Sequence, residues 1–272
     1  MPDPLDDSTA TEFRPVPRYL LEVCVATLDD ALAAREGGAD RVELNSALEL
    51  GGLTPSAGTM LAVTQSVDLP VIAMIRPRAG GFCYTPALFR TMCADIERAL
   101  AHGANGAAIG LLDVDNRLDL GRLREVRSIV GDADLVFHRA FDLVPDPFEA
   151  LEQLIELGVD RILTSGRKPR AIAGAALLDQ LRRQAAGRIG LVAGGGVAVG
   201  GLEELVAESG CREYHGSFRG TMDDPTMQAG SAREFRSAFG SPAGLLSGTD
   251  AAAVRAVRDW LDARNVAEGV EG

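Results

Sequence analysis

Two acidic side chains interrupt apolar runs near the start of the chain, where buried carboxylates could perform acid–base chemistry. Glu22 lies in the run 20–25 and Glu43 in the run 41–45, and each alternates with aliphatic neighbours. Alternate residues of a β-strand point to opposite faces, so each carboxylate lies on the face that its aliphatic neighbours leave free. Burial raises the pKa of a carboxylate and suits it to act as a general base. We therefore predict catalytic roles for Glu22 and Glu43.

Basic and imidazole side chains stand at the ends of other apolar runs. Carboxylates inside a protein need partners of this kind. We expect His138 to act as a general acid or a second base, and Arg76 and Arg139 to orient an anion or to stabilise an oxyanion. For any single buried Glu–Arg pair, an internal salt bridge is the alternative. The predicted catalytic set is Glu22, Glu43, Arg76, His138, Arg139 and His215.

Short apolar runs alternate with helical patterns along most of the chain, which indicates a parallel sheet. Capping residues such as Thr27 and Thr85 mark helix starts between the runs. We predict an α/β fold, a single (β/α)8 TIM barrel with parallel strands that spans residues 19–266 and includes a C-terminal helix. An open doubly wound sheet is the alternative. The eight runs are 20–25, 41–45, 71–76, 106–112, 134–138, 161–165, 189–194 and 212–216.

The loops that follow the strands of such a barrel surround its active site. Three glycines after the seventh run allow the backbone to approach an anion closely, although a tight turn would explain them as well. The predicted anion-binding residues are Gly194, Gly195, Gly196 and Ser217. The loop 78–84 has the glycines of a mobile lid, although a well-packed loop is equally consistent with it. The predicted substrate-loop residues are Arg78, Phe82, Tyr84 and Asp142.

The composition limits the partners of this chain. Its 272 residues have a formal net charge of −12, which disfavours nucleic acid as a partner. No apolar run is long enough to span a bilayer, and residues 1–18 have the composition of a disordered lead-in rather than of a signal peptide. The four cysteines form no CxxC pair. We therefore expect a cytoplasmic protein with reduced cysteines, a small-molecule or metal ligand, and neither a nucleic-acid nor a membrane partner.

The chain resembles the CutC family over residues 19–220. The resemblance implies a TIM barrel, a role in copper homeostasis, copper binding through cysteines and a homo-oligomer. Cys24 matches a family cysteine, whereas Asn45 replaces the second cysteine that many members have. The motifs that carry the likeness are LEVC (21–24), DRVEL (40–44), GGLTPS (51–56), IRPR (75–78), GFCY (81–84), GLLDVDNRLD (110–119), FHRAFD (137–142), LTSG (163–166), AGGGV (193–197) and YHGS (214–217).

Two functions follow as hypotheses. The first is a copper-binding protein in which Cys24 is the metal ligand, with Met74 as a further soft donor. The loss of a second thiolate at Asn45 weakens that site. The second is an isomerase, epimerase or lyase that acts on a small oxygen-rich, possibly phosphorylated substrate, with no cofactor or with an unidentified divalent metal. Glu43, His138 and His215 are the candidate ligands of that metal.

Overall fold

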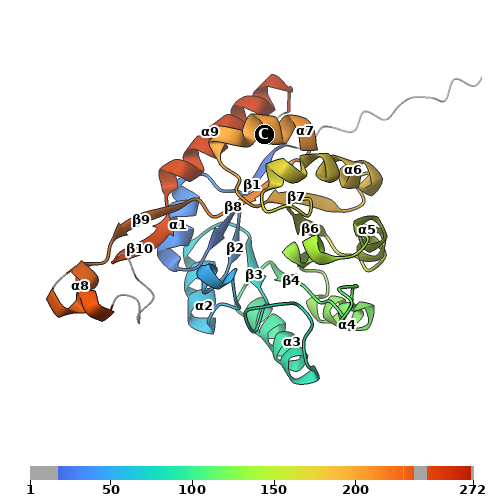
Figure 1. Cartoon of the computed structure of the whole chain (residues 1–272), viewed down its shortest axis with the longest axis horizontal. Coiled ribbons are helices and arrows are strands. Elements are labelled where there is room, and N and C mark those ends of the chain that lie inside the picture. Colours follow the sequence, from blue (N-terminus) through green and yellow to red (C-terminus); the bar gives the residue numbers. More distant parts are fainter. Residues whose placement is uncertain (1–17, 229, 236–243, 271–272) are drawn as a thin grey trace, which may run out of the picture.

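Eight parallel strands close into a barrel in this computed structural model, which describes residues 18–228, 230–235 and 244–270. The last strand pairs with the first, so the predicted barrel is confirmed and the open sheet is excluded (Figure 1). The predicted lead-in, residues 1–18, lies outside the described residues except for Arg18. The strands are β1 (Leu20–Val25), β2 (Arg41–Leu44), β3 (Val71–Met74), β4 (Gly106–Ile109), β5 (Asp134–Phe137), β6 (Arg161–Thr164), β7 (Gly190–Gly194) and β8 (Glu213–Gly216).

Helices surround the strands (Figure 1), and the capping residues predict where several of them begin. Thr27 accepts a hydrogen bond from the Asp30 amide at 3.0 Å, and Thr85 accepts one from the Leu88 amide at 3.3 Å. These side chains satisfy amides that have no partner within the first helical turn. The helices are α1 (Leu28–Glu36), α2 (Ala57–Ser66), α3 (Pro86–Ala101), α4 (Leu120–Val130), α5 (Pro147–Glu156), α6 (Ala175–Ala185), α7 (Leu202–Ser209) and the C-terminal α9 (Ala251–Ala267).

Aliphatic residues of the strands form two separate cores. Leu21, Val23 and Val42 belong to the large cluster between the strands and the helices. A smaller cluster that includes Met74 and Leu163 fills the inside of the barrel. Because residues alternate between the two sides, Glu22 and Glu43 are left on the inner side, where each is only 3% exposed.

A chain of ion pairs compensates the charges inside the barrel. Arg41 bonds to Glu22 at 2.5 Å and to Glu213 at 2.8 Å, and Arg161 bonds to Glu213 at 3.1 Å. Arg161 also bonds to Asp134 at 2.7 Å. The partner of the buried Glu22 is therefore a neighbour on the adjacent strand, since Glu22 and Arg41 lie in register on β1 and β2. This corrects the expectation that arginines at the strand ends pair with it.

A two-stranded antiparallel ribbon leaves the barrel after β8, and the sequence patterns did not predict it. Its strands β9 (Arg219–Asp223) and β10 (Leu245–Thr249) pair with each other, and the short helix α8 (Pro225–Gln228) follows β9 (Figure 1). The C-terminal helix consequently begins at Ala251. Arg219 bonds to Asp30 at 3.0 Å, which ties the ribbon to the start of α1.

Among the described residues, no helix combines the length and the apolar character needed to cross a bilayer.

The buried network makes a prediction about stability. Arg41→Leu leaves the buried Glu22 and the partly buried Glu213 without their shared cation, so we expect the free energy of unfolding to fall by roughly 3 kcal/mol. Urea denaturation monitored by circular dichroism measures this change. Arg188→Leu is the matched control, because Arg188 pairs with Glu152 on the exposed surface and its loss should change stability little. Equal effects of the two substitutions would contradict the prediction.

Candidate functional site at the mouth of the barrel

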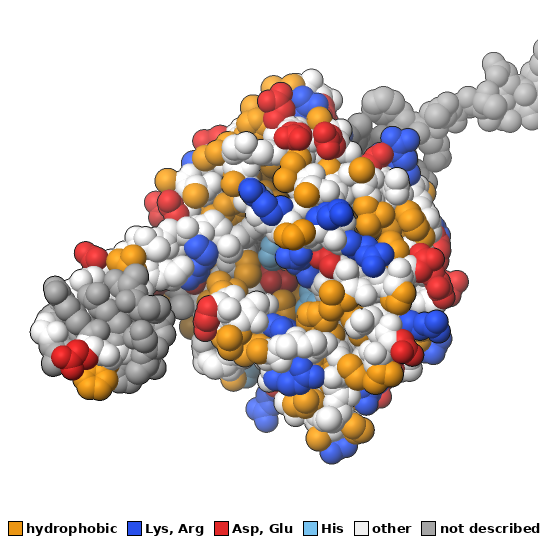
Figure 2. Space-filling model, viewed as in Figure 1, with side chains coloured by type: hydrophobic (Ala, Val, Ile, Leu, Met, Phe, Trp, Pro, Cys, Tyr) orange, Lys and Arg blue, Asp and Glu red, His pale blue; other side chains and the backbone are white. Residues whose placement is uncertain are grey.

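A cavity of about 650 Å³ opens at the carboxyl ends of the strands, the size of a small-molecule site. Figure 2 shows this face hollowed near its middle, with histidine and acidic side chains in the hollow. The predicted site residues that line the cavity are Cys24, Glu43, Arg76, Phe82, His138, Arg139, Gly195, Gly196, His215 and Ser217. Those that do not line it are Glu22, Arg78, Tyr84, Asp142 and Gly194.

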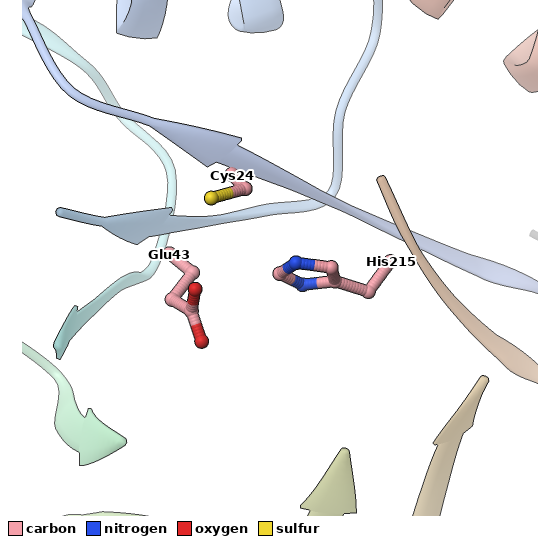
Figure 3. A group of neighbouring side chains, drawn as sticks. All are labelled: Cys24, Glu43 and His215. Atoms are coloured by element: carbon pink, nitrogen blue, oxygen red, sulfur yellow. The ribbon is translucent and has the colours of Figure 1, made fainter. Parts of the chain in front are cut away.

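A thiol, a carboxylate and an imidazole meet on one wall of the cavity. The ligand atoms of Cys24, Glu43 and His215 lie within 4.8 Å of one another. Figure 3 shows the three side chains pointing into a common space from β1, β2 and β8. In the described part of the chain, this is the group of His, Cys, Asp and Glu that could hold a metal ion. The group contains Cys24, the copper ligand expected from the sequence, together with Glu43 and His215 of the alternative divalent-metal set, and it does not include His138.

Glu22 lies beneath this group and holds His215 from below. Its Oε1 is 2.7 Å from His215 Nδ1, and its other oxygen bonds to Arg41. Burial would raise the pKa of Glu22, but Arg41 and His215 outweigh burial and lower it to about 2. Burial would lower the pKa of His215, yet hydrogen bonds with Cys24 and Glu22 and the nearby Glu43 raise it well above 6.5. The raised pKa favours the imidazolium form of His215, in which Nδ1–H donates to Glu22.

Burial has the opposite consequence for the two neighbouring acids. It raises the pKa of Glu43, with His215 opposing the shift, and it raises the pKa of the Cys24 thiol. Asn45 joins the two groups, because its Nδ2 lies 3.2 Å from Cys24 Sγ and 3.0 Å from Glu43 Oε2. Asn45 was noted in the sequence only as a missing cysteine. The register of β1 against β2 places Cys24 beside Glu43, and knowledge of that register would have predicted that Asn45 contacts both residues.

His138 differs from His215 in both charge and orientation. The Ala140 amide donates to His138 Nδ1 at 3.1 Å, so the ring carries its proton on Nε2. Burial and the charge of Arg76 lower the pKa of His138 to about 3. The His138 ring fits beside Gly110, the residue after β4, because glycine has no side chain. A Cβ at position 110 would lie only 2.1 Å from His138 Cε1. His138 is thus a neutral hydrogen-bond donor.

Arg76 and Arg139, the two arginines predicted to orient an anion, already use part of their hydrogen-bonding capacity within the protein. Arg76 donates to the carbonyls of Leu50, Gly52 and Gly80, which joins the loops after β2 and β3. Arg139 bonds to Asp142 at 2.9 Å and to Ser165 Oγ at 2.8 Å. Asp142 also accepts hydrogen bonds from Thr164 Oγ1 at 2.6 Å and from loop amides, so this carboxylate positions the rim.

The loop 78–84 contributes one of its three predicted side chains to the cavity. Phe82 packs against His138 with ring centroids 4.9 Å apart. Arg78 instead donates to the carbonyls of Ala79, Gly81 and Cys83 and stacks over the ring of Tyr84. Tyr84 is itself 4% exposed and packs in the main core. Neither Arg78 nor Tyr84 lines the cavity, so the predicted contact of these two residues with a substrate stays a prediction.

Glycines after β7 form another part of the rim. Gly195 has a φ of +110°, a backbone conformation that L side chains rarely adopt, and lies beside Arg139 Nη1. Gly194 ends the strand and contacts Leu163 and His215 instead of lining the cavity. Arg219 and Ser247 of the unpredicted ribbon also reach the cavity.

A larger hollow of about 940 Å³ lies beside the base of the barrel and contains no predicted site residue. Its arginines already pair with carboxylates, as in Arg182 with Asp179 and Arg212 with Glu268.

Comparison with known proteins identifies the family. The CutC family model matches residues 19–220. The chain belongs to the CutC family. A human protein named copper homeostasis protein cutC homolog is 44% identical to this chain, and the match covers 75% of this chain and 75% of the human protein. A CutC family protein of Treponema denticola is 40% identical, and the match covers 77% of this chain and 85% of that protein.

Solved structures agree with this assignment. The crystal structure of a CutC protein from Streptococcus agalactiae superposes with a TM-score of 0.70 at 32% identity, covering 73% of this chain and 98% of that one. A thiamine phosphate pyrophosphorylase from Pyrococcus furiosus matches with a TM-score of 0.55 at 15% identity over 93% of this chain and 98% of that one, which supports the barrel fold alone. The family assignment and the TIM barrel predicted from sequence are both confirmed.

The Glu22–His215 contact makes a prediction about pH. Glu22→Gln removes the carboxylate that accepts from Nδ1, so we expect the pKa of His215 to fall by roughly one unit or more. Because the folded pKa of His215 is raised, its stabilising charge is fully present below about pH 6.5 and is lost as the pH rises through the folded value. NMR titration of the histidine ring protons measures the shift, with Glu152→Gln as a control on an exposed carboxylate. An unchanged His215 pKa in Glu22→Gln would contradict the assignment.

Proposed function

We propose that this CutC protein takes part in copper homeostasis by binding copper(I) at the Cys24–His215 wall of the barrel mouth. The relatives named for copper homeostasis support this role, and so does the donor set. Copper(I) is soft and prefers sulfur ligands, with imidazole a suitable partner. The thioether of Met74 lines the same cavity. The single observation that carries the proposal is the cluster of Cys24, Glu43 and His215 ligand atoms within 4.8 Å.

The surroundings of His215 fit the role of a metal ligand. Histidines that bind metals commonly donate their other ring N–H to a carboxylate, which fixes the ring and increases its basicity. Glu22 is placed to accept that N–H, since it lies 2.7 Å from Nδ1. Binding then displaces the protons of His215 Nε2 and of the Cys24 thiol, so copper affinity should rise with pH.

A copper titration tests this proposal. We expect one copper(I) ion to bind in competition with a chelator, and Cys24→Ala to weaken binding at least 100-fold because the sole thiolate of the group is lost. Asn45→Cys should tighten binding at least tenfold, since the Asn45 amide lies 3.2 Å from Cys24 Sγ and a thiol there would supply a second soft donor. Cys83→Ser, which alters an exposed cysteine, is the control. Unchanged affinity in Cys24→Ala would refute the site.

A second candidate function is proton-transfer catalysis of the isomerase, epimerase or lyase type. The cavity of about 650 Å³ is far larger than an ion needs, and this observation favours an organic ligand. Glu43 is the base, because burial raises its pKa and its Oε1 has no partner among the described residues. It would take a proton from carbon, and the imidazolium of His215 would lie beside the charge that forms.

Deuterium exchange tests this second function. The protein is incubated in D₂O with a metabolite extract, and mass spectrometry follows deuterium incorporation at carbon as Glu43 returns a solvent-derived deuteron. We expect incorporation into a limited set of compounds, reduced at least 100-fold in Glu43→Gln. Glu49→Gln, at another carboxylate of the cavity lining, is the control. Incorporation that is absent, or equal in Glu43→Gln, would contradict catalysis by Glu43.

We further propose a cytoplasmic, homo-oligomeric protein that does not bind nucleic acid. The free cysteines support a reducing compartment, the net charge of −12 opposes binding to phosphate backbones, and the family resemblance favours the oligomer.

A further inference from the structure

Two buried hydrogen-bond donors belong to residues that line the cavity. His138 is 3% exposed and Arg76 is 7% exposed, and both line the cavity. His138 Nε2 and Arg76 Nε have no hydrogen-bond partner among the residues that the structure describes. Most buried polar atoms in proteins are paired, so two unpaired donors in one site require an explanation.

Packing holds both donors in place. The Ala140 amide occupies His138 Nδ1, which leaves the proton on Nε2. Carbonyls of two loops hold the terminal nitrogens of Arg76, which leaves Nε–H free. Phe82 lies between the two groups, with its ring centroid 5.3 Å from the Arg76 guanidinium carbon and 4.9 Å from the His138 ring centroid. Two rigid donors are therefore available to oxygen atoms of a ligand.

The wall formed by β2 offers the opposite chemistry. Glu43 Oε1 and Asn45 Oδ1 are buried and have no hydrogen-bond partner within the described part of the chain, and both residues line the cavity. These oxygens accept hydrogen bonds, as from the hydroxyl groups of a ligand.

The rim adds the guanidinium of Arg139, whose Nε pairs with Asp142. Arg139 lines the cavity, and its Nη1 would lie 3.4 Å from a Cβ placed on Gly195. The Gly195–Gly196 backbone and Ser217 line the same part of the rim. An anionic group is thus favoured there.

We propose that the cavity binds a small hydroxylated organic anion whose oxygens accept from His138 Nε2–H and Arg76 Nε–H and whose hydroxyl groups donate to Glu43 and Asn45. This inference rests on the second candidate function, which needs an organic ligand, and it names the class of that ligand. The anionic group is a carboxylate or a phosphate, because both present oxygens that match these donors.

Isothermal titration calorimetry of the full chain with two pairs of probes tests the inference. D-gluconate is compared with the neutral polyol D-sorbitol, and glycerol 3-phosphate with glycerol. We expect at least one anion to bind with a dissociation constant below 10 mM, at least tenfold tighter than its neutral counterpart. If gluconate binds and glycerol 3-phosphate does not, the anionic group of the ligand is a carboxylate. If only glycerol 3-phosphate binds, the anionic group is a phosphate.

Variants of His138 test the donor. His138→Leu should weaken binding of the anion about tenfold or more, whereas His138→Gln retains an N–H donor and should restore most of it. His102→Leu, the same change at a histidine outside this cavity, is the control, and thermal unfolding checks the fold of each variant. Failure of both anions to bind, or equal binding to the unmodified chain and to a folded His138→Leu, would overturn the inference.

Copper and deuterium measurements on the unmodified chain separate the possible failures. Anion binding without deuterium incorporation supports this inference and contradicts catalysis. Copper binding without anion binding overturns this inference and leaves the copper function standing.

Discussion

A carboxylate held inside the barrel between a guanidinium and an imidazolium is the interaction on which the rest of the site depends. Glu22 bonds to Arg41 on one side and to His215 on the other, and it is 3% exposed. A carboxylate so deeply buried is stable only when both of its oxygens are paired. The same contacts link the ion pairs at the base of the barrel to the cavity at its mouth, so residues that do not line the cavity influence the pKa of His215.

Two histidines consequently serve the cavity in opposite forms. Hydrogen bonds with Cys24 and Glu22 raise the pKa of His215 and favour its charged form, whereas burial and the charge of Arg76 lower the pKa of His138 and favour its neutral form. One wall therefore combines a thiol, a carboxyl and an imidazolium, and the other presents neutral and guanidinium donors. The first wall suits a metal that competes with protons, and the second suits oxygens of an organic ligand. The two proposed functions share Glu43, which belongs to the possible metal-binding group and is also the proposed base.

Much of this arrangement could be predicted from the sequence. Eight apolar runs with helix caps between them gave the barrel, and alternation within single strands placed Glu22, Cys24 and Glu43 on its inner side. Family motifs gave the assignment that the comparisons confirm. These features are local, or they repeat along the chain.

Contacts across the closure of the barrel could not be predicted in the same way. His215 meets Glu22 over a separation of 193 residues, and only the pairing of β8 with β1 brings them together. The position of Arg76 at the end of a predicted strand did not show that backbone carbonyls of two loops would accept its hydrogen bonds. The sequence likewise did not show that Arg78 would stack on Tyr84. The ribbon of β9 and β10 escaped prediction because its short strands lack a buried alternating face.

The most direct test of the central claim is the protonation state of His215. Nitrogen-15 NMR of the histidine side chains at pH 7.5 reports whether each ring nitrogen carries a proton. The account predicts that both nitrogens of His215 are protonated, with Nδ1–H shared with Glu22, and that His138 is protonated on Nε2 alone. A neutral His215 ring at that pH would contradict it.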